Sequence, residues 1–185
     1  MDKDHEIIFA GFGGQGILSM GKILAYAGLE EGYEVCWLPS YGPEMRGGTA
    51  NCSVIISSKK ISSPISTNYD CGILLNQPSM DKFESKIKPG GILLYETAEI
   101  IKVSERDDIN ILGLSAFEEA QKMEVKQVAN MIILGALINN TCIVKIDSVL
   151  KALEDVLPQR HHHLIPINKK ALLKGMEIAE KEVLN

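Results

Sequence analysis

The feature that most constrains the fold is a cluster of glycines close to the start of the chain. A short apolar segment, residues 6–10, leads into Gly11-Phe12-Gly13-Gly14-Gln15-Gly16, and helical spacing of apolar residues begins directly afterwards. Glycines allow a tight turn between a strand and a helix, and the start of a helix offers free backbone N–H groups to an anion. The pattern therefore predicts a strand, a glycine-rich turn and a helix, which is the opening unit of an α/β fold.

The rest of the chain alternates between short apolar runs and amphipathic segments. Further strands are predicted over residues 34–38, 71–75, 91–95 and 109–112, and helices over residues 79–87, 116–123, 128–139, 148–156 and 169–182. Residues 50–57 and 61–66 flank a polar turn and predict a hairpin, which introduces antiparallel pairing. Asp147 and Asn168 are suitable N-caps for the last two helices. We expect one α/β domain over residues 1–185, a three-layer α/β/α sandwich with a mixed, mostly parallel sheet.

Composition excludes several classes of function. The chain has 185 residues, 19 basic against 24 acidic side chains, a net charge of -5 and 5% aromatic residues. A chain of this length can bury a sufficient core as one domain, and its acidity argues against binding nucleic acid. The longest apolar run, residues 131–138, is far shorter than the ~20 residues that span a bilayer. With a charged N-terminus that lacks the order of a secretory signal, we expect a cytoplasmic protein that binds neither nucleic acid nor membranes.

The predicted first helix is unusually apolar. From residue 17 to residue 29 its polar positions are Ser19, Lys22 and the hydroxyl of Tyr26, which form one narrow stripe. Such a helix is either packed deeply within its own domain or covered by another chain. We favour coverage by another chain, and deep packing stays open as the alternative.

The glycine turn suggests contact with a ligand. Gly11, Gly13 and Gly16 match the GxGxxG spacing of dinucleotide-binding turns. Such a domain also needs Asp or Glu at the end of the second strand, where this chain has Leu38-Pro39-Ser40, so the nicotinamide interpretation is weakened. The turn is then either a site of anion or cofactor contact or a turn needed only for close helix packing. The candidate ligand-contacting residues are Gly13, Gly14, Gln15 and Gly16.

A second candidate segment, Tyr41-Gly42-Pro43-Glu44-Met45-Arg46-Gly47-Gly48, follows the second predicted strand. Loops at the carboxyl edge of an α/β sheet commonly bind ligands. The guanidinium of Arg46 can hold a carboxylate or a phosphate through two parallel hydrogen bonds, and the glycines after it allow close approach. Alternatively, Glu44 and Arg46 form a salt bridge within the loop or across a subunit interface. The candidate binding residues here are Tyr41, Glu44, Arg46, Gly47 and Gly48.

The sequence assigns no catalytic residue and no metal ligand. The cysteines, Cys36, Cys52, Cys71 and Cys142, are far apart and lack the spacing of an iron–sulfur or structural zinc site. His161, His162 and His163 lie between two prolines with no carboxylate or cysteine to complete a metal site. We expect the histidines to form an exposed loop, and their role stays open.

The two glycine-containing segments together resemble a known family. Phe9-Ala10-Gly11-Phe12-Gly13-Gly14-Gln15-Gly16, followed by Tyr41-Gly42-Pro43-Glu44-Met45-Arg46-Gly47-Gly48, is similar to the gamma subunit of the 2-oxoacid:ferredoxin oxidoreductases. Residues 130–136 and 167–171 also resemble the family pattern. The resemblance implies a multi-subunit enzyme that decarboxylates a 2-oxoacid on thiamine diphosphate. It further implies that electrons pass through iron–sulfur clusters to ferredoxin and that the acyl group passes to coenzyme A.

The resemblance also implies a division of labour. Thiamine diphosphate, magnesium and the clusters belong to alpha and beta subunits and, as an open point, a ferredoxin-like delta subunit, whereas coenzyme A and the 2-oxoacid are substrates of the complex. This chain then carries no cofactor, is inactive alone and completes or stabilises the active complex. The segment from Tyr41 to Gly48 resembles the 2-oxoglutarate and branched-chain branches, which makes 2-oxoglutarate the expected substrate. The alternatives are a stand-alone nucleotide- or coenzyme A-binding reductase and a pure assembly scaffold.

Overall fold

A computed structural model of the chain describes residues 4–41 and 48–183. All six strands lie in the first two thirds of the chain, with α1 after the first strand and α2 after the fourth, and the remaining helices follow the last strand. The strands are β1 (His5–Phe12), β2 (Glu34–Tyr41), β3 (Thr49–Ser57), β4 (Tyr69–Leu74), β5 (Ile87–Glu96) and β6 (Asn110–Leu114). The helices are α1 (Ile17–Glu30), α2 (Gln77–Phe83), α3 (Ala116–Lys122), α4 (Ala129–Thr141), α5 (Ile146–Val156) and α6 (Ile165–Val183), with 3-10 turns η1 (Glu84–Lys86), η2 (Lys126–Val128) and η3 (Gln159–Leu164).

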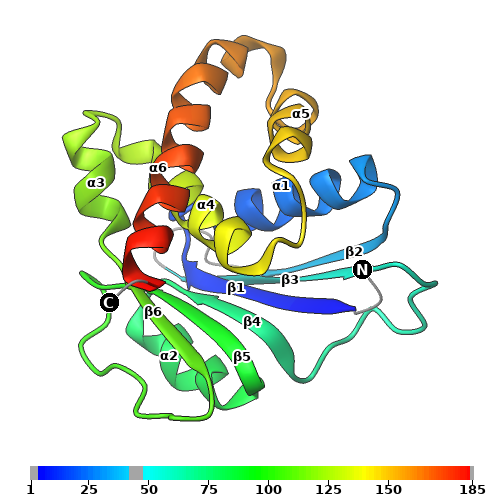
Figure 1. Ribbon diagram of the computed structural model, residues 1–185, viewed down its shortest axis with the longest axis vertical. Coiled ribbons are helices and arrows are strands. Elements are labelled where there is room, and N and C mark those ends of the chain that lie inside the picture. The colour runs from blue at the N-terminus through cyan, green and yellow to red at the C-terminus, as the bar shows by residue number, and fades with distance from the viewer. Residues whose placement is uncertain (1–3, 42–47, 184–185) are drawn as a thin grey trace.

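The strands form one mixed sheet in the order β2-β3-β1-β4-β5-β6. β1, β4, β5 and β6 pair in parallel, while β3 runs antiparallel to both of its neighbours. Figure 1 shows α2 on one face of the sheet and α1, α4, α5 and α6 on the other. The predicted three-layer α/β/α arrangement with a mixed, mostly parallel sheet is confirmed.

The source of the antiparallel pairing differs from the prediction. Residues 50–57 do form β3, but residues 61–66 form no strand, so the predicted hairpin between them is wrong. This segment contains Pro64, which has no N–H to donate to a ladder, and serines that contribute little apolar surface. β3 instead pairs with β2, in a register that places Tyr41 opposite Ala50.

The two predicted helix caps are also wrong. Helix α5 starts at Ile146 after Lys145, so Asp147 lies in its first turn, where a negative charge still favours the positive end of the helix dipole. Helix α6 starts earlier than predicted, at Ile165, with Pro166 in its first turn. Asn168 is therefore inside the helix, and its Nδ2 donates to the carbonyl oxygen of Leu164 at 2.8 Å.

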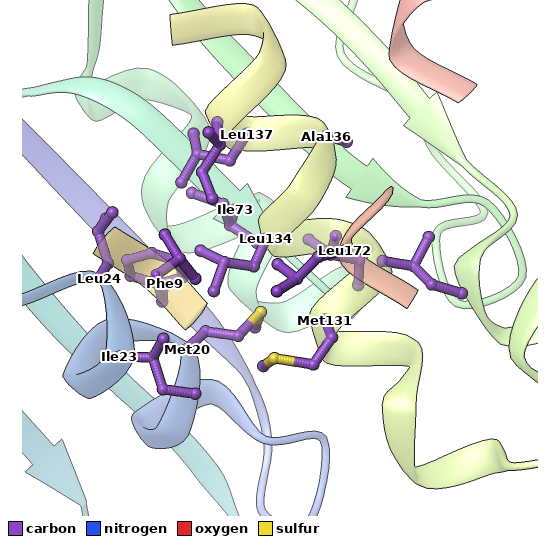
Figure 2. Close-up of a cluster of buried hydrophobic side chains, with 14 of the residues drawn as sticks. Phe9, Met20, Ile23, Leu24, Ile73, Met131, Leu134, Ala136, Leu137 and Leu172 are labelled. Carbon is purple, nitrogen blue, oxygen red and sulfur yellow. The ribbon is translucent and has the colours of Figure 1, made fainter. Parts of the chain in front are cut away.

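The larger core cluster lies between the sheet and the helical face, where Phe9 of β1 meets α1, α4 and α6 (Figure 2). Helix α4 crosses its centre, with every residue from Met131 to Ile138 buried. It packs closely on α6, because a Cβ at Gly135 or Gly175 would overlap a backbone carbonyl oxygen of the other helix. Within the described part of the chain, no helix combines the length and the apolar character needed to cross a membrane.

Helix α1 owes its narrow polar stripe to packing inside the domain. The helix lies on β2 and β3 with one side and against α5 with another (Figure 1). Its buried residues are Ile17, Met20, Gly21, Ile23, Leu24, Ala25, Ala27 and Gly28. The chain itself therefore covers the apolar surface for which we favoured another chain, and the deep-packing alternative is the one the structure supports.

Candidate functional site

The glycine turn lies at the carboxyl edge of the parallel strands, between β1 and α1. Gly14 and Gly16 have φ angles of 100° and 78°, in the left-handed region that side chains other than glycine adopt only with strain. Gly16 is the N-cap of α1, and among the described residues no side chain caps this helix and no acidic residue lies in its first turn. The N–H groups at the start of α1 are therefore left for water or for an anion.

The structure brings the glycine turn and the second candidate segment together. The backbone N–H of Gly13 donates to the carbonyl oxygen of Gly48 at 3.0 Å, and Phe12 pairs with Thr49 at the end of the β1–β3 ladder. Gly13, Gly14, Gly16 and Gly48 line one hollow of about 320 Å³, together with Leu18 and Ser19 of α1. Two segments about thirty residues apart in sequence thus form one site.

Several predicted site residues are not placed. Glu44, Arg46 and Gly47 lie outside the described residues, as does the side chain of Tyr41, whose backbone ends β2. Ligand contact through Arg46 therefore stays a prediction, as does its alternative, a salt bridge with Glu44.

Gln15 is turned into the fold. Its Oε1 accepts from the backbone N–H of Phe12 at 2.6 Å, and its Nε2 donates to the carbonyl oxygen of Leu75 at 3.2 Å. The amide therefore links the end of β1 to the residue that follows β4. No pattern in the sequence indicates this structural role, because Leu75 lies 60 residues away from Gln15.

A second hollow, of about 410 Å³, opens on the other side of the glycine turn. Its lining consists of Gly14, Gln15, Gly16, Phe117, Gln121, Lys126, Gln127, Ala129 and Asn130. Asn130 packs directly on the turn, since a Cβ at Gly16 would overlap its side chain. Sequence reasoning identified residues 130–136 only through the family resemblance and missed Gln121 and Lys126.

One wall of the second hollow is held by a fully buried carboxylate, Glu96, at the carboxyl end of β5. Its Oε2 accepts from the N–H of Phe117 at 3.2 Å and its Oε1 from the N–H of Ala98 at 3.3 Å. Burial raises the pKa of Glu96, and the backbone hydrogen bonds oppose that rise. Glu96 thus fixes the start of α3, the helix that carries Phe117 and Gln121, and sequence analysis did not identify it.

The cysteines do not converge. Cys52 and Cys71 are buried, Cys36 is half-buried and Cys142 is exposed, and burial raises the pKa of the Cys52 thiol to about 12. Between residues 4–41 and 48–183 no group of three or more His, Cys, Asp or Glu side chains is placed to hold a metal. These thiols therefore do not fit an iron–sulfur cluster, which needs convergent thiolates.

The three histidines lie in a defined turn. They form part of the 3-10 helix η3, and a ring nitrogen of His162 lies 2.9 Å from the carbonyl oxygen of Leu157. None of the three is buried. The expected loop is therefore a helical turn, and the His162 contact joins it to Leu157, the residue that follows α5.

Comparison with known proteins identifies the family. Residues 6–178 match the model of the pyruvate ferredoxin/flavodoxin oxidoreductase family. The chain belongs to this family. One curated relative is ketoisovalerate oxidoreductase subunit VorA of Methanothermobacter marburgensis, which is 41% identical over 135 residues. The match covers 73% of this chain and 28% of VorA. The 2-oxoglutarate synthase subunit KorC of Methanocaldococcus jannaschii is 34% identical over 180 residues, covering 95% of this chain and 94% of KorC.

Solved structures of the family agree with the fold. The gamma subunit of a keto/oxoacid ferredoxin oxidoreductase from Geobacter sulfurreducens matches with a TM-score of 0.84 and 30% identity over 97% of this chain and 98% of that one. A 2-oxoglutarate:ferredoxin oxidoreductase from Magnetococcus marinus, solved with 2-oxoglutarate, coenzyme A and succinyl-CoA bound, matches with a TM-score of 0.88 and 27% identity. That match covers 98% of this chain and 32% of the longer one. This chain therefore corresponds to about a third or less of the longer relatives and to nearly the whole of the shorter ones.

Proposed function

We propose that this chain is the gamma subunit of a 2-oxoacid:ferredoxin oxidoreductase whose substrate is 2-oxoglutarate. The observation that carries the proposal is the match to KorC, which spans nearly all of both chains, whereas VorA is matched over 28% of its length. In the proposed reaction, 2-oxoglutarate, coenzyme A and two oxidised ferredoxins give succinyl-CoA, carbon dioxide, two reduced ferredoxins and a proton. The carbon–carbon bond to the carboxylate breaks, a thioester bond forms, and the two electrons pass to ferredoxin.

Within that complex, the gamma chain contributes a binding surface and carries no cofactor. The cofactors, thiamine diphosphate with magnesium and the iron–sulfur clusters, belong to alpha and beta subunits and to a ferredoxin-like delta subunit where one is present. The scattered thiols of this chain support that division. The hollow formed by the glycine turn and Gly48 completes a neighbour's active site or contacts coenzyme A, with Arg46, Glu44 and Tyr41 as further contacts.

The backbone of the glycine turn is suited to an anion. Carboxylates of the 2-oxoacid and phosphates of coenzyme A both prefer the positive end of a helix, and α1 begins at this hollow with uncapped N–H groups in the described structure. The chain's role in the reaction is then to orient an anionic group and to exclude water, with no proton or electron transfer of its own.

A branched-chain 2-oxoacid is the second candidate substrate. VorA, named for ketoisovalerate, is 41% identical to this chain over the shared region, a higher identity than that of KorC.

A cytoplasmic location is part of the same proposal, since the proposed partners and ferredoxin operate there.

The test is reconstitution of the complex from this chain and the proposed alpha and beta subunits, with the delta subunit where one is present. Ferredoxin reduction is followed with 2-oxoglutarate or 2-oxoisovalerate as substrate, with and without coenzyme A, and with this chain included or omitted. We expect coenzyme A-dependent reduction with 2-oxoglutarate only when this chain is present, and none from this chain alone. Preference for 2-oxoisovalerate would select the second candidate, and turnover of NAD(P)H by the isolated chain would overturn the proposal in favour of a stand-alone reductase.

A further inference from the structure

We infer that Gln15 is a positioning residue that holds the glycine turn and the chain at Gly48 in a single arrangement. The inference rests on the proposed function in so far as the hollow between them serves the complex. It assigns to Gln15 a role through the backbone of the turn, rather than contact with a ligand.

The contacts of Gln15 require both halves of its amide. The Oε1 atom accepts from Phe12 N–H at 2.6 Å, and the Nε2 atom donates to the Leu75 carbonyl oxygen at 3.2 Å. Leu75 is fully buried, and its own N–H donates to the carbonyl oxygen of Ala10 at 2.9 Å. The side chain therefore bridges two neighbouring parallel strands at the point where both end, and only a side chain with one acceptor and one donor at this length completes both bonds.

The residue at position 11 has to be a glycine to leave room for this bridge. A Cβ at Gly11 would overlap the Oε1 atom of Gln15 and would lie 2.9 Å from Cδ1 of Ile17. The glycine at position 11 is thus explained by the presence of the glutamine side chain. The turn is built around Gln15, and a displaced amide would also displace Phe12, the last residue of β1.

Movement of Phe12 would reach the site directly. The next residue, Gly13, donates its N–H to Gly48 at 3.0 Å, and Gly14 and Gly16 line both hollows beside the turn. Gln15 thereby sets the distance between the start of α1 and the end of the segment that contains Arg46. A loss of this bridge alters the shape of both hollows, and Gln15 itself, in the second hollow, is the one lining residue that the substitution changes.

The substitution Gln15→Glu provides a test by pH. In its neutral form the introduced carboxyl has a hydroxyl that can donate to Leu75 and an oxygen that can accept from Phe12, so it reproduces both bonds. In its ionised form it is an acceptor only and faces the Leu75 carbonyl oxygen. Partial burial and the carbonyl both raise the pKa of the introduced group, while Lys126, the charged side chain in the lining of the second hollow, lowers it.

Activity is measured in the assembled complex as kcat/KM relative to wild type at each pH. We expect Gln15→Glu to lose about tenfold in kcat/KM where the introduced carboxyl is ionised and to recover activity as the pH falls toward its pKa, with the assembled complex intact by gel filtration. Gln121→Glu is the matched control, because it makes the same change in the same hollow, at an exposed side chain that forms no hydrogen bond to another described residue. Gln15→Met, which has similar length and no amide, should lose activity equally at every pH.

Hydrogen exchange of the full chain by itself separates this inference from the proposed function. We expect the amide of Gly13 to exchange about tenfold faster in Gln15→Glu at high pH, relative to the wild type under identical conditions, and this difference to shrink at low pH. Wild-type kinetics and exchange in Gln15→Met, or equal behaviour of Gln15→Glu and Gln121→Glu, would overturn the positioning role. Unfolding of Gln15→Glu at every pH would also overturn it, because the side chain would then hold the whole fold. A wild-type chain that supports no 2-oxoacid oxidation would refute the proposed function and leave the exchange result standing.

Discussion

Replacing Gly16 by alanine tests the packing of the glycine turn quantitatively. Gly16 has a φ of 78°, which costs an alanine about 1–2 kcal/mol. The added Cβ would also overlap the Asn130 side chain and lie 2.9 Å from its Cγ, and overpacking of this kind costs about 1–3 kcal/mol. We therefore expect Gly16→Ala to lower the free energy of unfolding by about 2–5 kcal/mol.

The matched control is Gly32→Ala. Gly32 has a φ of 79°, and a Cβ there would meet no atom within 4 Å, so only the backbone cost applies. Urea unfolding of the full chain should show Gly16→Ala to be the less stable variant by about 1–3 kcal/mol. The double substitution Gly16→Ala with Asn130→Ala should recover most of that difference, because it removes the overlapping amide and no described residue bonds its buried Oδ1. Equal stability of Gly16→Ala and Gly32→Ala would refute the steric account of the turn.

Three further results are expected. Cys142→Gly should raise the free energy of unfolding by about 0.5–1 kcal/mol in urea titrations, because Cys142 ends α4 at a φ of 49° that favours glycine. Glu96→Gln should be less stable than wild type at acidic pH by about 1–3 kcal/mol, because it loses an acceptor for a buried N–H. Because the pKa of Glu96 is raised in the folded state, its protonated form stabilises the fold at low pH, and this contribution is lost as the pH rises through the folded-state pKa. The difference in free energy of unfolding between wild type and Glu96→Gln should therefore become smaller toward neutral pH. A difference that stays constant with pH would contradict the raised pKa. Arg46→Lys in the assembled complex should lower kcat/KM or assembly affinity about tenfold to hundredfold, and wild-type kinetics with wild-type assembly would leave only a loop salt bridge.

The local part of the fold could be predicted from sequence because its causes are local. Gly14 and Gly16 adopt left-handed angles that few other residues tolerate, so the strand, turn and helix could be recognised from adjacent residues alone. The family resemblance was likewise carried by contiguous segments. The match over residues 6–178 confirms it.

The parts of the fold that were not predicted correctly depend on contacts between residues far apart in the chain. Whether β3 pairs with β2 or with residues 61–66 depends on packing that the strand itself does not encode, and the predicted hairpin was wrong. The apolar surface of α1 was assigned to a partner chain because α5, which packs against this helix, lies more than a hundred residues later in the chain. The contact between Gln15 and Leu75 also joins residues that are far apart in the chain, so it could not be predicted from the sequence. The predicted role of Arg46 stays a prediction.

The measurement that tests the central claim most directly is purification of the native complex from cells that produce this chain. A tag on this chain should recover stoichiometric partner subunits that contain thiamine diphosphate and iron–sulfur clusters, and the eluate should reduce ferredoxin with 2-oxoglutarate only when coenzyme A is added. The tagged chain itself, separated from these partners, should contain no iron. Recovery of the chain alone, together with stoichiometric iron or an activity of its own, would contradict the assignment of this protein as a gamma subunit.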